Sequence, residues 1–372
     1  MAVYLDHAAS SPMRPEVLDA MTPWFHDRHA NPTAAHRAGR RARQALDDAR
    51  ATLADAIGFS TGDIVFTGGG TESDNLAIGR RRPPGTTVVS AIEHPAVLTP
   101  AELQDAHIVG VDAAGVLDLD ALRDVLDDTT EVVSVMIVNN ETGVVQPWSE
   151  IAEIVRALAP NAVLHTDAVQ ALAWLDLAEV VGDVDQMSIT GHKLGGPQGV
   201  GASAIRSHSA LEPLLVGGGQ ERDRRAGTQN VAGAVGFAKA VELTRSDRDE
   251  RLRRVDSLAE RLLGGLQAAT SGVTPTVPRD LRVPGIVHLL VDGVDSEALL
   301  FLLDEADLAC SAASSCASGA QGGSHVLAAM GLDTSDCAPL RLSLGWSTTE
   351  TEVEAAIDLV SRSVATLRGS HG

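Results

Sequence analysis

The stretch that decides the fold is Gln186-Met187-Ser188-Ile189-Thr190-Gly191-His192-Lys193. Its first part is an apolar run typical of a buried strand, and a glycine-rich segment follows Lys193. Lys193 is therefore expected at a strand end, which is where α/β proteins place their chemistry. The chain has only two lysines, Lys193 and Lys239, although arginine is plentiful. A lysine kept at this position predicts a role that arginine cannot fill.

Lys193 and Asp167 together indicate one kind of chemistry. A second strand, expected at 163–166, ends just before Asp167. A desolvated lysine can lose its proton and form a Schiff base with a carbonyl, whereas arginine stays charged. An acidic side chain holds the ring nitrogen of pyridoxal phosphate protonated, so that the ring accepts electrons. The pair predicts a pyridoxal phosphate site, but a lysine after a strand is most often a solvated residue, so the prediction depends on its neighbours.

Length and composition exclude several classes of protein. The 372 residues suggest about two domains at roughly 150 residues each. No apolar run reaches the roughly 20 residues that span a bilayer, and the first residues lack a basic, apolar signal segment, so we expect a cytoplasmic protein. A net charge of −21 argues against direct nucleic-acid binding, because phosphates would be repelled. The three cysteines, Cys310, Cys316 and Cys337, are too few for a disulfide framework, and with His325 they do not predict a zinc site.

The order of elements predicts an α/β fold with a mostly parallel sheet flanked by helices. Strands are expected at 63–67, 87–90, 107–111, 132–138, 163–166, 186–189 and 201–205. Helices are expected at 39–57, from 72, and at 95–104, 118–126 and 149–158. The helix at 39–57 has apolar residues at helical spacing and should end at Gly58.

The pattern changes after about residue 242. A polar helix is expected at 249–269, a strand at 285–291, a helix at 296–306 and a strand at 341–344. The capping pattern from Ser347 to Glu350 is expected to open the last helix. These elements predict a smaller α+β domain at the C-terminal end. We therefore assign 13–245 to a large domain, and 1–12 with 246–372 to a small one.

A phosphate-binding turn is predicted at Gly68-Gly69-Gly70-Thr71, between a strand and a helix. Backbone amides and the helix dipole both favour an anion there. Glycine turns at strand ends are common, and this one matches neither the P-loop nor the dinucleotide fingerprint. A nucleotide-binding α/β protein remains an alternative for this feature alone. Together with the Thr190 hydroxyl and the His192 imidazole, just before Lys193, the turn predicts a phosphate cup.

Three other segments carry polar side chains that could bind a cofactor or a substrate. His94 follows a strand, where its ring could lie on a pyridine ring, although a solvated loop histidine fits equally well. Asn139 and Asn140 end another strand and could bind ring or substrate oxygens, or simply form a turn. Arg225 and Thr228 belong to a segment that offers charge and a hydroxyl to a phosphate, as a solvated loop would too.

Cys316 is the candidate nucleophile among the cysteines. It lies in a segment rich in serine, alanine and glycine, which has few side chains that could anchor the segment by packing. A structural cysteine normally belongs to an apolar element, whereas a loop can carry a thiol into a site. Cys310 and Cys337 fit a structural role better.

The sequence resembles the cysteine desulfurases, a class V aminotransferase group among the fold type I pyridoxal phosphate enzymes. The resemblance runs from Tyr4 to Gly345 and is most specific in Gly70-Thr71-Glu72-Ser73-Asp74-Asn75, Val138-Asn139-Asn140-Glu141-Thr142-Gly143, Gly191-His192-Lys193 and Ser315-Cys316. The length of the segment around Cys316 resembles the longer-loop branch of the family. That branch passes sulfur to acceptor proteins.

The resemblance implies a role for each matching residue. It implies that Lys193 carries the cofactor, Asp167 pairs with the ring nitrogen, Gln170 contacts the ring oxygen and His94 stacks on the ring and acts as acid or base. It implies that Gly70, Thr71, Thr190, Gly191 and His192 bind the phosphate, with Thr228 reaching it from the second subunit of a homodimer. It implies that Asn140 and Arg341 bind the carboxylate of the substrate L-cysteine, and that Cys316 receives sulfur as a persulfide. No metal is implied, except that Cys316 could be a transient ligand of an iron–sulfur cluster.

Two departures and several alternatives stay open. Thr190 stands where the family often has serine, and Ser315 where alanine is frequent. A related aminotransferase, a selenocysteine lyase and a non-catalytic binding protein are the other readings. The sulfur acceptor is not predicted: an iron–sulfur scaffold, a tRNA thiolation enzyme, a molybdenum-cofactor enzyme and a DNA-sulfur modification system all fit.

Overall fold

A seven-stranded sheet forms the centre of the larger part of the molecule. The computed structural model describes residues 2–79, 86–206, 212–312 and 323–369. Within these ranges the strand order is β2 (Ile64–Thr67), β8 (Gly201–Ile205), β7 (Gln186–Thr190), β6 (Val163–Asp167), β5 (Thr130–Ser134), β3 (Thr86–Ser90) and β4 (His107–Val109). The strands from β7 to β4 are parallel, and β8 is antiparallel to both of its neighbours. The predicted α/β fold with a mostly parallel sheet is confirmed.

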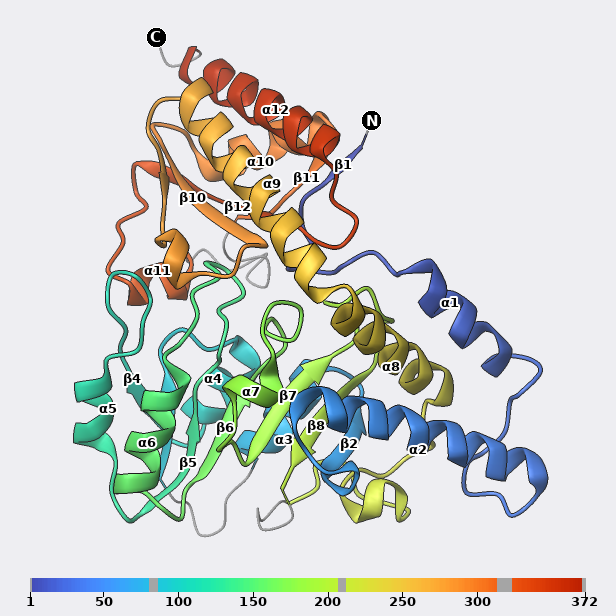
Figure 1. Ribbon diagram of the computed structural model, residues 1–372. Helices are drawn as coiled ribbons and strands as arrows, with labels where there is room; N and C mark the ends of the chain where they lie inside the picture. The colour runs from blue at the N-terminus through green and yellow to red at the C-terminus, as the bar shows by residue number, and fades with distance from the viewer. Residues whose placement is uncertain (1, 80–85, 207–211, 313–322, 370–372) are drawn as a thin grey trace.

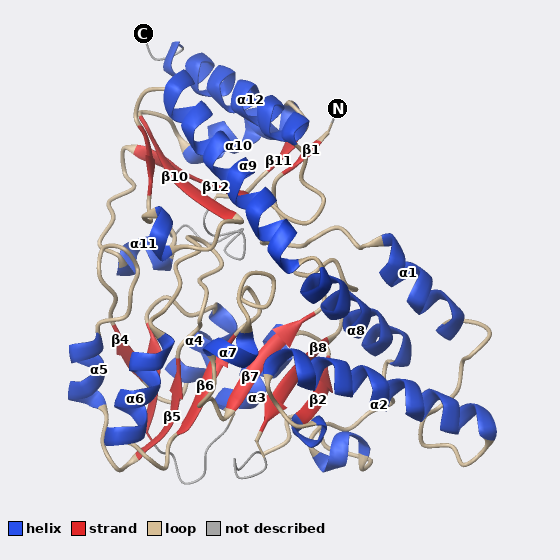
Figure 2. Cartoon of the chain, viewed as in Figure 1, coloured by secondary structure: helices blue, strands red, loops and turns tan. Residues whose placement is uncertain are grey.

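Helices lie on both faces of this sheet (Figure 2). Those of the larger part are α1 (Pro15–Met21), α2 (Arg37–Ile57), α3 (Gly70–Ile78), α4 (Pro95–Glu102), α5 (Leu119–Val125), α6 (Trp148–Leu158), α7 (Leu177–Val180) and α8 (Val231–Ser246). On α2, the predicted apolar positions, such as Leu46, Leu53 and Ile57, are buried, each contributing about 1.5–3 kcal/mol. The helix ends where predicted, at Gly58, whose φ of +71° suits glycine.

A second, smaller group of elements lies above the sheet in Figure 1. Its antiparallel sheet has the order β12 (Cys337–Ser343), β10 (Ile286–Asp292) and β9 (Val273–Pro275). Its helices are α9 (Arg248–Ala269), α10 (Ser296–Glu305), α11 (His325–Ala329) and α12 (Glu350–Gly369). α9 continues from α8 and runs alongside α12 (Figure 1). The predicted boundary at 245/246 falls beside Asp247, the residue between α8 and α9, and the division into domains stays a prediction.

The N-terminal segment connects the two groups. Strand β1 (Val3–Tyr4) pairs in parallel with β11 (Leu308–Ala309) in the smaller group. Further along, the Ala8 N–H donates to the Ser343 hydroxyl at 2.9 Å, and the Ser11 N–H donates to the His192 carbonyl at 2.8 Å. The segment therefore runs from the small sheet to the loop that carries Lys193.

Several expected element boundaries differ from the structure, and two of the differences have a clear physical reason. The strand expected at 132–138 is regular only over Thr130–Ser134; beyond it the Met136 N–H donates to the buried Glu93 carboxylate at 2.5 Å and not to a neighbouring strand. The cap of the last helix is Thr349 with Glu352, not Ser347 with Glu350. The Glu352 N–H donates to the Thr349 hydroxyl at 3.2 Å, and the Thr349 N–H donates to the Glu352 carboxylate at 2.8 Å.

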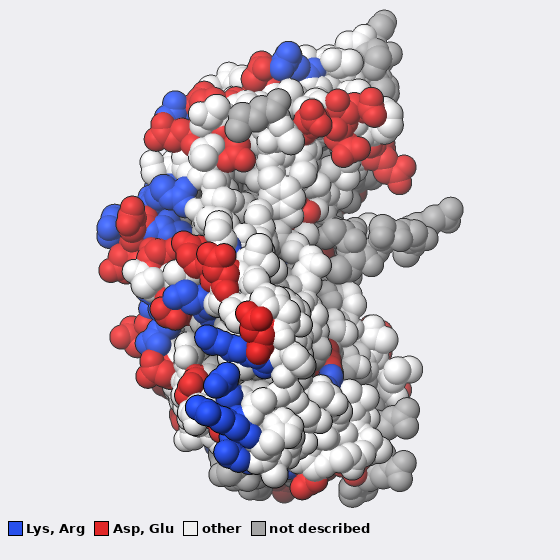
Figure 3. Space-filling model, turned by 90° about the vertical axis from the view of Figure 1, so that its right-hand side faces the viewer, with Lys and Arg blue, Asp and Glu red and all other residues white. Residues whose placement is uncertain are grey.

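The charged surface is not uniformly acidic. Figure 3 shows basic side chains gathered mainly along the left-hand side of the view, interspersed with acidic ones, while much of the rest of this face is uncharged. Exposed arginines cluster at the start of α2, among them Arg37, Arg40 and Arg41. In the described ranges, no helix has both the length and the apolar character needed to cross a membrane.

Candidate active site

Lys193 lies in the turn that follows β7, three residues beyond the last residue of the strand. All five residues of β7 are buried, which fixes the start of the turn. The Lys193 Nζ donates to the Ala8 carbonyl at 2.6 Å and to the Ala9 carbonyl at 2.8 Å. The N-terminal segment thus holds the amine in one place, at the carboxyl end of the strand.

Asp167 is the last residue of β6, the strand next to β7, and pairs in register with Ser188. Its side chain is buried, and its Oδ1 accepts the Val169 N–H at 2.8 Å. Burial raises the pKa of Asp167 to about 6, while the Val169 N–H and the charge of Lys193 both lower it. The two predicted strand ends are therefore neighbours, and an acid and an amine meet at one edge of the sheet.

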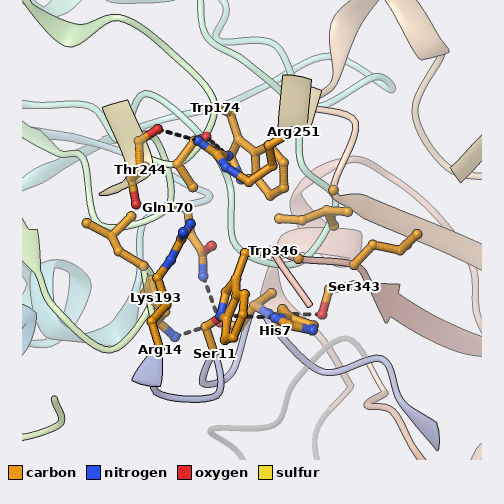
Figure 4. Close-up of a pocket in the computed structure, with 17 residues that line it drawn as sticks. His7, Ser11, Arg14, Gln170, Trp174, Lys193, Thr244, Arg251, Ser343 and Trp346 are labelled. Atoms are coloured by element: carbon orange, nitrogen blue, oxygen red, sulfur yellow. Dashed lines mark hydrogen bonds between the residues drawn. The ribbon is translucent and has the colours of Figure 1, made fainter. Parts of the chain in front are cut away.

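Gln170 and Lys193 converge on a single backbone oxygen (Figure 4). The Gln170 Nε2 donates to the Ala8 carbonyl at 2.7 Å. Behind them lies a small cavity of about 30 Å³, lined by both side chains and by His7, Arg14 and other residues of the two groups of elements. Sequence reasoning assigns no role to Ala8 and Ala9, because they act through carbonyl groups that every residue has.

His94 caps helix α4. Its Nδ1 accepts the Ala96 N–H at 3.1 Å, so the imidazole is fixed at the edge of the sheet. Burial, together with the charges of Lys193 and His325, lowers the pKa of His94 to about 4. The ring is therefore neutral at pH 7, which suits stacking on a flat ring.

The predicted glycine turn leads into helix α3, which begins at Gly70. Gly69 has φ +154° and ψ −177°, a conformation essentially restricted to glycine. A Cβ on Gly70 would lie 2.8 Å from Cγ2 of Val169, so glycine is needed for the turn to pack against the segment after β6. The first N–H groups of a helix have no acceptor within it and can bind an anion.

A hollow of about 720 Å³ opens over this turn. Gly68, Gly69, Gly70, Thr71 and His192 are among the residues that line it. Thr190 is not among them and is 2% exposed. Its hydroxyl is hydrogen bonded to the His192 Nδ1 at 3.0 Å and donates to the Val200 carbonyl at 3.1 Å. Thr190 thus orients the His192 ring, whose pKa is lowered to about 4 by burial and then by Lys193.

Glu72 and Arg225 connect the turn to a distant loop. The Arg225 guanidinium donates to both carboxylate oxygens of Glu72, at 2.9 and 3.2 Å, and the Glu72 Oε2 accepts the Gly68 N–H at 2.7 Å. The predicted Thr228 lies three residues beyond Arg225, is exposed, and is not among the described residues that line the hollow. Nothing in the spacing of the sequence indicated the Glu72–Arg225 pair.

Asn140 and Arg341, to which the resemblance assigns the substrate carboxylate, lie together. Arg341 is 1% exposed on β12. Its Nη1 donates to the Asn140 carbonyl at 2.9 Å, and its Nη2 pairs with the Asp6 carboxylate at 2.8 Å. Arg341 therefore joins the small sheet, the N-terminal segment and the turn after β5, and it contacts Asn140 through the backbone.

Cys316 lies outside the described residues. The residues on either side of residues 313–322 are anchored beside the site. Ser311 exchanges backbone hydrogen bonds with Arg341 at 2.7 and 3.2 Å. After the segment, the Ser324 hydroxyl donates to the Glu141 carboxylate at 2.5 Å, and the His325 Nε2 lies 2.9 Å from the Glu93 carbonyl.

The other two thiols are poor nucleophiles. Burial raises the pKa of Cys310 to about 12, and burial and nearby aspartates also raise that of Cys337. Both thiols therefore stay protonated at neutral pH, and the thiolate is the reactive form. Within the described residues, no group of three or more His, Cys, Asp or Glu side chains could hold a metal ion.

These residues fit pyridoxal phosphate. The amine of Lys193, the buried acid of Asp167 and the neutral imidazole of His94 have the chemistry that its aldehyde, ring nitrogen and ring face require. The glycine turn at the start of α3 offers backbone amides without side chains in the way. Ring and phosphate sites both lie at the carboxyl end of the parallel strands.

Comparison with known proteins places the chain among characterised relatives. The model of the aminotransferase class-V family matches residues 3–356. The chain is 38% identical to an IscS-like cysteine desulfurase of Mycobacterium tuberculosis, over 98% of this chain and 97% of that protein. Among solved structures, a NifS-like protein superposes with a TM-score of 0.91 at 31% identity, covering 99% of this chain and 100% of the other. The structure of SspA in complex with cysteine gives a TM-score of 0.80 at 30% identity, covering 92% of this chain and 98% of that one.

Proposed function

This chain belongs to the class-V aminotransferase family, and we infer that it is a cysteine desulfurase, which converts L-cysteine to L-alanine and retains the sulfur. The observation that carries the inference is the pairing of Lys193 and Asp167 at the ends of two adjacent parallel strands. Relatives that match over nearly the whole chain are cysteine desulfurases, and one related structure contains cysteine.

Pyridoxal phosphate is the cofactor that these residues would hold. Lys193 would be its covalent attachment point, Asp167 would hold the ring nitrogen, Gln170 would contact the ring oxygen and His94 would stack on the ring. Gly70, Thr71, Gly191 and His192 would bind the phosphate, with Thr190 orienting His192. When bound, the cofactor supplies an electron sink that weakens bonds at the substrate's α-carbon.

The protein contributes binding and proton transfer. Arg341 and Asn140 bind the carboxylate of L-cysteine, for which the planar guanidinium is well shaped. Because Asp6 already pairs with the Arg341 Nη2, the substrate shares this arginine with the N-terminal segment. The Nζ of Lys193 moves the proton of the α-carbon, and the neutral His94 imidazole accepts or donates a proton nearby.

Cys316 takes the sulfur. Its thiolate attacks the sulfur of L-cysteine, a new S–S bond forms and the C–S bond of the substrate breaks. The electron pair of that bond stays with the substrate carbon, which gains a proton and becomes the methyl group of alanine. The products are L-alanine and a persulfide on Cys316, so atoms and electrons balance without an external oxidant.

We propose a homodimer in which Thr228 of a second copy completes the phosphate site. Leu214 lines the hollow, and the run Leu214, Leu215 and Val216 is 44, 46 and 81% exposed. An apolar run of this kind beside an open hollow is what a second copy would cover. The persulfide then passes to an acceptor protein, such as an iron–sulfur scaffold or a tRNA thiolation enzyme. The expected cytoplasmic location stays a prediction.

The experiment is a Cys316→Ser variant assayed for both halves of the reaction. Sulfide release from L-cysteine in the presence of a reductant should fall by a factor of about 10³ or more, because the nucleophile is lost. Borohydride reduction and peptide mapping should still find the cofactor on Lys193. Cys337→Ser is the matched control and should keep full turnover. Full turnover in Cys316→Ser would overturn the sulfur assignment, and an adduct on Lys239, or none, would overturn the cofactor site.

A further inference from the structure

A buried row of polar side chains crosses the sheet beneath the site. Ser134 on β5 is the register partner of His165 on β6, and Ser188 lies on the next strand, β7, two residues beyond Gln186, the register partner of His165. The His165 Nδ1 is 2.8 Å from the Ser134 hydroxyl and its Nε2 is 3.1 Å from the Ser188 hydroxyl. All three residues are fully buried.

Asp74 ends this row. It lies on α3, which packs on β7 and β8, and its side chain is 2% exposed. The Ser188 hydroxyl is near enough to its carboxyl group to act on it as a hydrogen-bond donor. The Asp74 Oδ1 has no hydrogen-bond partner among the described residues. Among the described residues, the basic atom within 4 Å of Oδ1 is the His165 Nε2, at 3.9 Å. Burial lowers the pKa of His165 to about 3, so this imidazole is neutral.

This environment opposes a charge on Asp74. An ionised carboxylate in a dry site needs a cation or several donors, and Asp74 has one hydroxyl. The charged and titratable groups around it are Asp167, Glu93 and His165, and none of them is cationic. Asp167, by contrast, has the Val169 N–H and the charge of Lys193. Two carboxylates that share a buried site do not both ionise, and the better compensated one keeps the charge.

We propose that Asp74 is a neutral carboxylic acid in the folded protein, so that Asp167 alone carries the negative charge beneath the ring. Glu93 is in the same state for the same reason: its Oε1 accepts the Met136 N–H, while its Oε2 has no hydrogen-bond partner in the described part of the chain. Burial and the charge of Asp167 raise the pKa of Asp74 well above its usual value. The role beneath the ring rests on the proposed function, whereas the protonation state does not.

The polar side chains of the row can form one consistent set of hydrogen bonds when Asp74 holds the proton. The Asp74 O–H then donates to the Ser188 hydroxyl, the Ser188 O–H donates to the His165 Nε2, and the His165 Nδ1–H donates to the Ser134 hydroxyl. A neutral histidine has one donor and one acceptor, so this direction uses both ring nitrogens. The orphaned Oδ1 is then the carbonyl oxygen of an acid, which costs far less to bury than a carboxylate oxygen.

The test is the pH dependence of unfolding in the cofactor-free protein, with Asp74→Asn compared to the wild type. In the unfolded chain an aspartate loses its proton near pH 3.9. The folded wild type keeps this proton, so its stability relative to Asp74→Asn is greatest below that pH and is lost as the pH rises. The unfolding constant of the wild type relative to the variant should therefore rise between pH 5 and 8, by up to about tenfold per pH unit. A ratio that does not change with pH would overturn the proposal.

Asp185→Asn is the matched control. Asp185 is also buried, but it pairs with Arg156 at 2.9 Å and accepts the Leu164 N–H at 2.8 Å. The unfolding constant of the wild type relative to Asp185→Asn should therefore not rise between pH 5 and 8.

Infrared spectroscopy of the wild type provides a measurement that needs no stable variant. At pH 7.5 the folded protein should show the carbonyl stretch of a protonated carboxylic acid, and its absence would contradict a neutral Asp74. Ser188→Ala, which leaves Asp74 in place, should shift part of that band. Glu93→Gln should remove another part. If the infrared bands and the pH dependence differ from these expectations, the desulfurase assignment still stands, since none of these measurements depends on turnover.

Discussion

Two regions of the candidate site differ in construction: the floor, formed by the buried acids under the predicted ring position, and the phosphate end, the hollow over the glycine turn before α3. The floor consists of buried side chains, with Asp167, Asp74 and Glu93 at 5, 1 and 0% exposure, all from one chain. The phosphate end is a hollow of about 720 Å³ bounded by backbone groups and by side chains such as His192 and Leu214. A dry floor controls charge, because electrostatic effects are strong where water is excluded. An open end of backbone amides binds an anion and leaves space for a ligand or a second copy of the chain.

This difference predicts which property of the enzyme a substitution in each region should change. A change in the floor alters the electronic environment of the ring and therefore turnover. A change at the phosphate end alters how well the cofactor is held, and excess cofactor should compensate for it. The Val169 residue joins the two regions, since its N–H donates to Asp167 and its side chain contacts Gly70.

The largest effect should come from Asp167→Asn. The amide keeps the shape of the side chain but removes the charge at the ring nitrogen, so kcat should fall by about 10²–10³. The affinity for pyridoxal phosphate, measured by fluorescence titration, should change by less than about tenfold. A variant that loses the cofactor but turns over normally when saturated with it would place Asp167 in the binding role instead.

An intermediate effect is expected for Gly70→Ala. The new Cβ would lie 2.8 Å from Val169 Cγ2, so the turn and Val169 must separate, at a cost of about 1–3 kcal/mol in the free energy of unfolding. Cofactor affinity should fall, and turnover should recover partly at high cofactor concentration. Gly264→Ala is the control, because nothing lies within 4 Å of its Cβ position in α9, and it should stabilise the protein by about 0.5–1 kcal/mol. Equal unfolding free energies for the two variants would contradict the packing argument.

The smallest effect should come from Arg225→Ala. Its pair with Glu72 is partly exposed, so stability should fall by only about 0.2–1 kcal/mol. The Glu72 carboxylate would then face the phosphate end without its cation, and the dissociation constant of the cofactor should rise several-fold. Arg245→Ala breaks a surface pair with Asp55 and is expected to leave that constant unchanged. If both variants bind the cofactor equally well, the Glu72–Arg225 pair serves the loop and not the phosphate site.

Much of the fold and part of the site could be predicted from the chain order. Strand ends were recognisable because apolar runs stop at polar residues, as at Asp167 and Lys193. The regular strand before Asn140 was predicted too long, because Glu93, far away in sequence, binds the Met136 N–H. Asp74 belongs to a motif of the family, but its burial beside Asp167 depends on how α3 packs against β7. The contacts of Ala8 and Ala9 with Lys193 could not be predicted, since they use backbone carbonyl groups, which are the same in every residue.

The sequence alone determined the class of fold and the position of a lysine just after β7, and it predicted pyridoxal phosphate chemistry, because periodicity and residue type are local properties. Only the tertiary structure decided which carbonyls hold Lys193, which arginine supports Glu72 and which of three buried acids carries the charge. Those outcomes depend on distance and on exclusion of water between segments far apart in the chain, and such distances are set only when the elements pack.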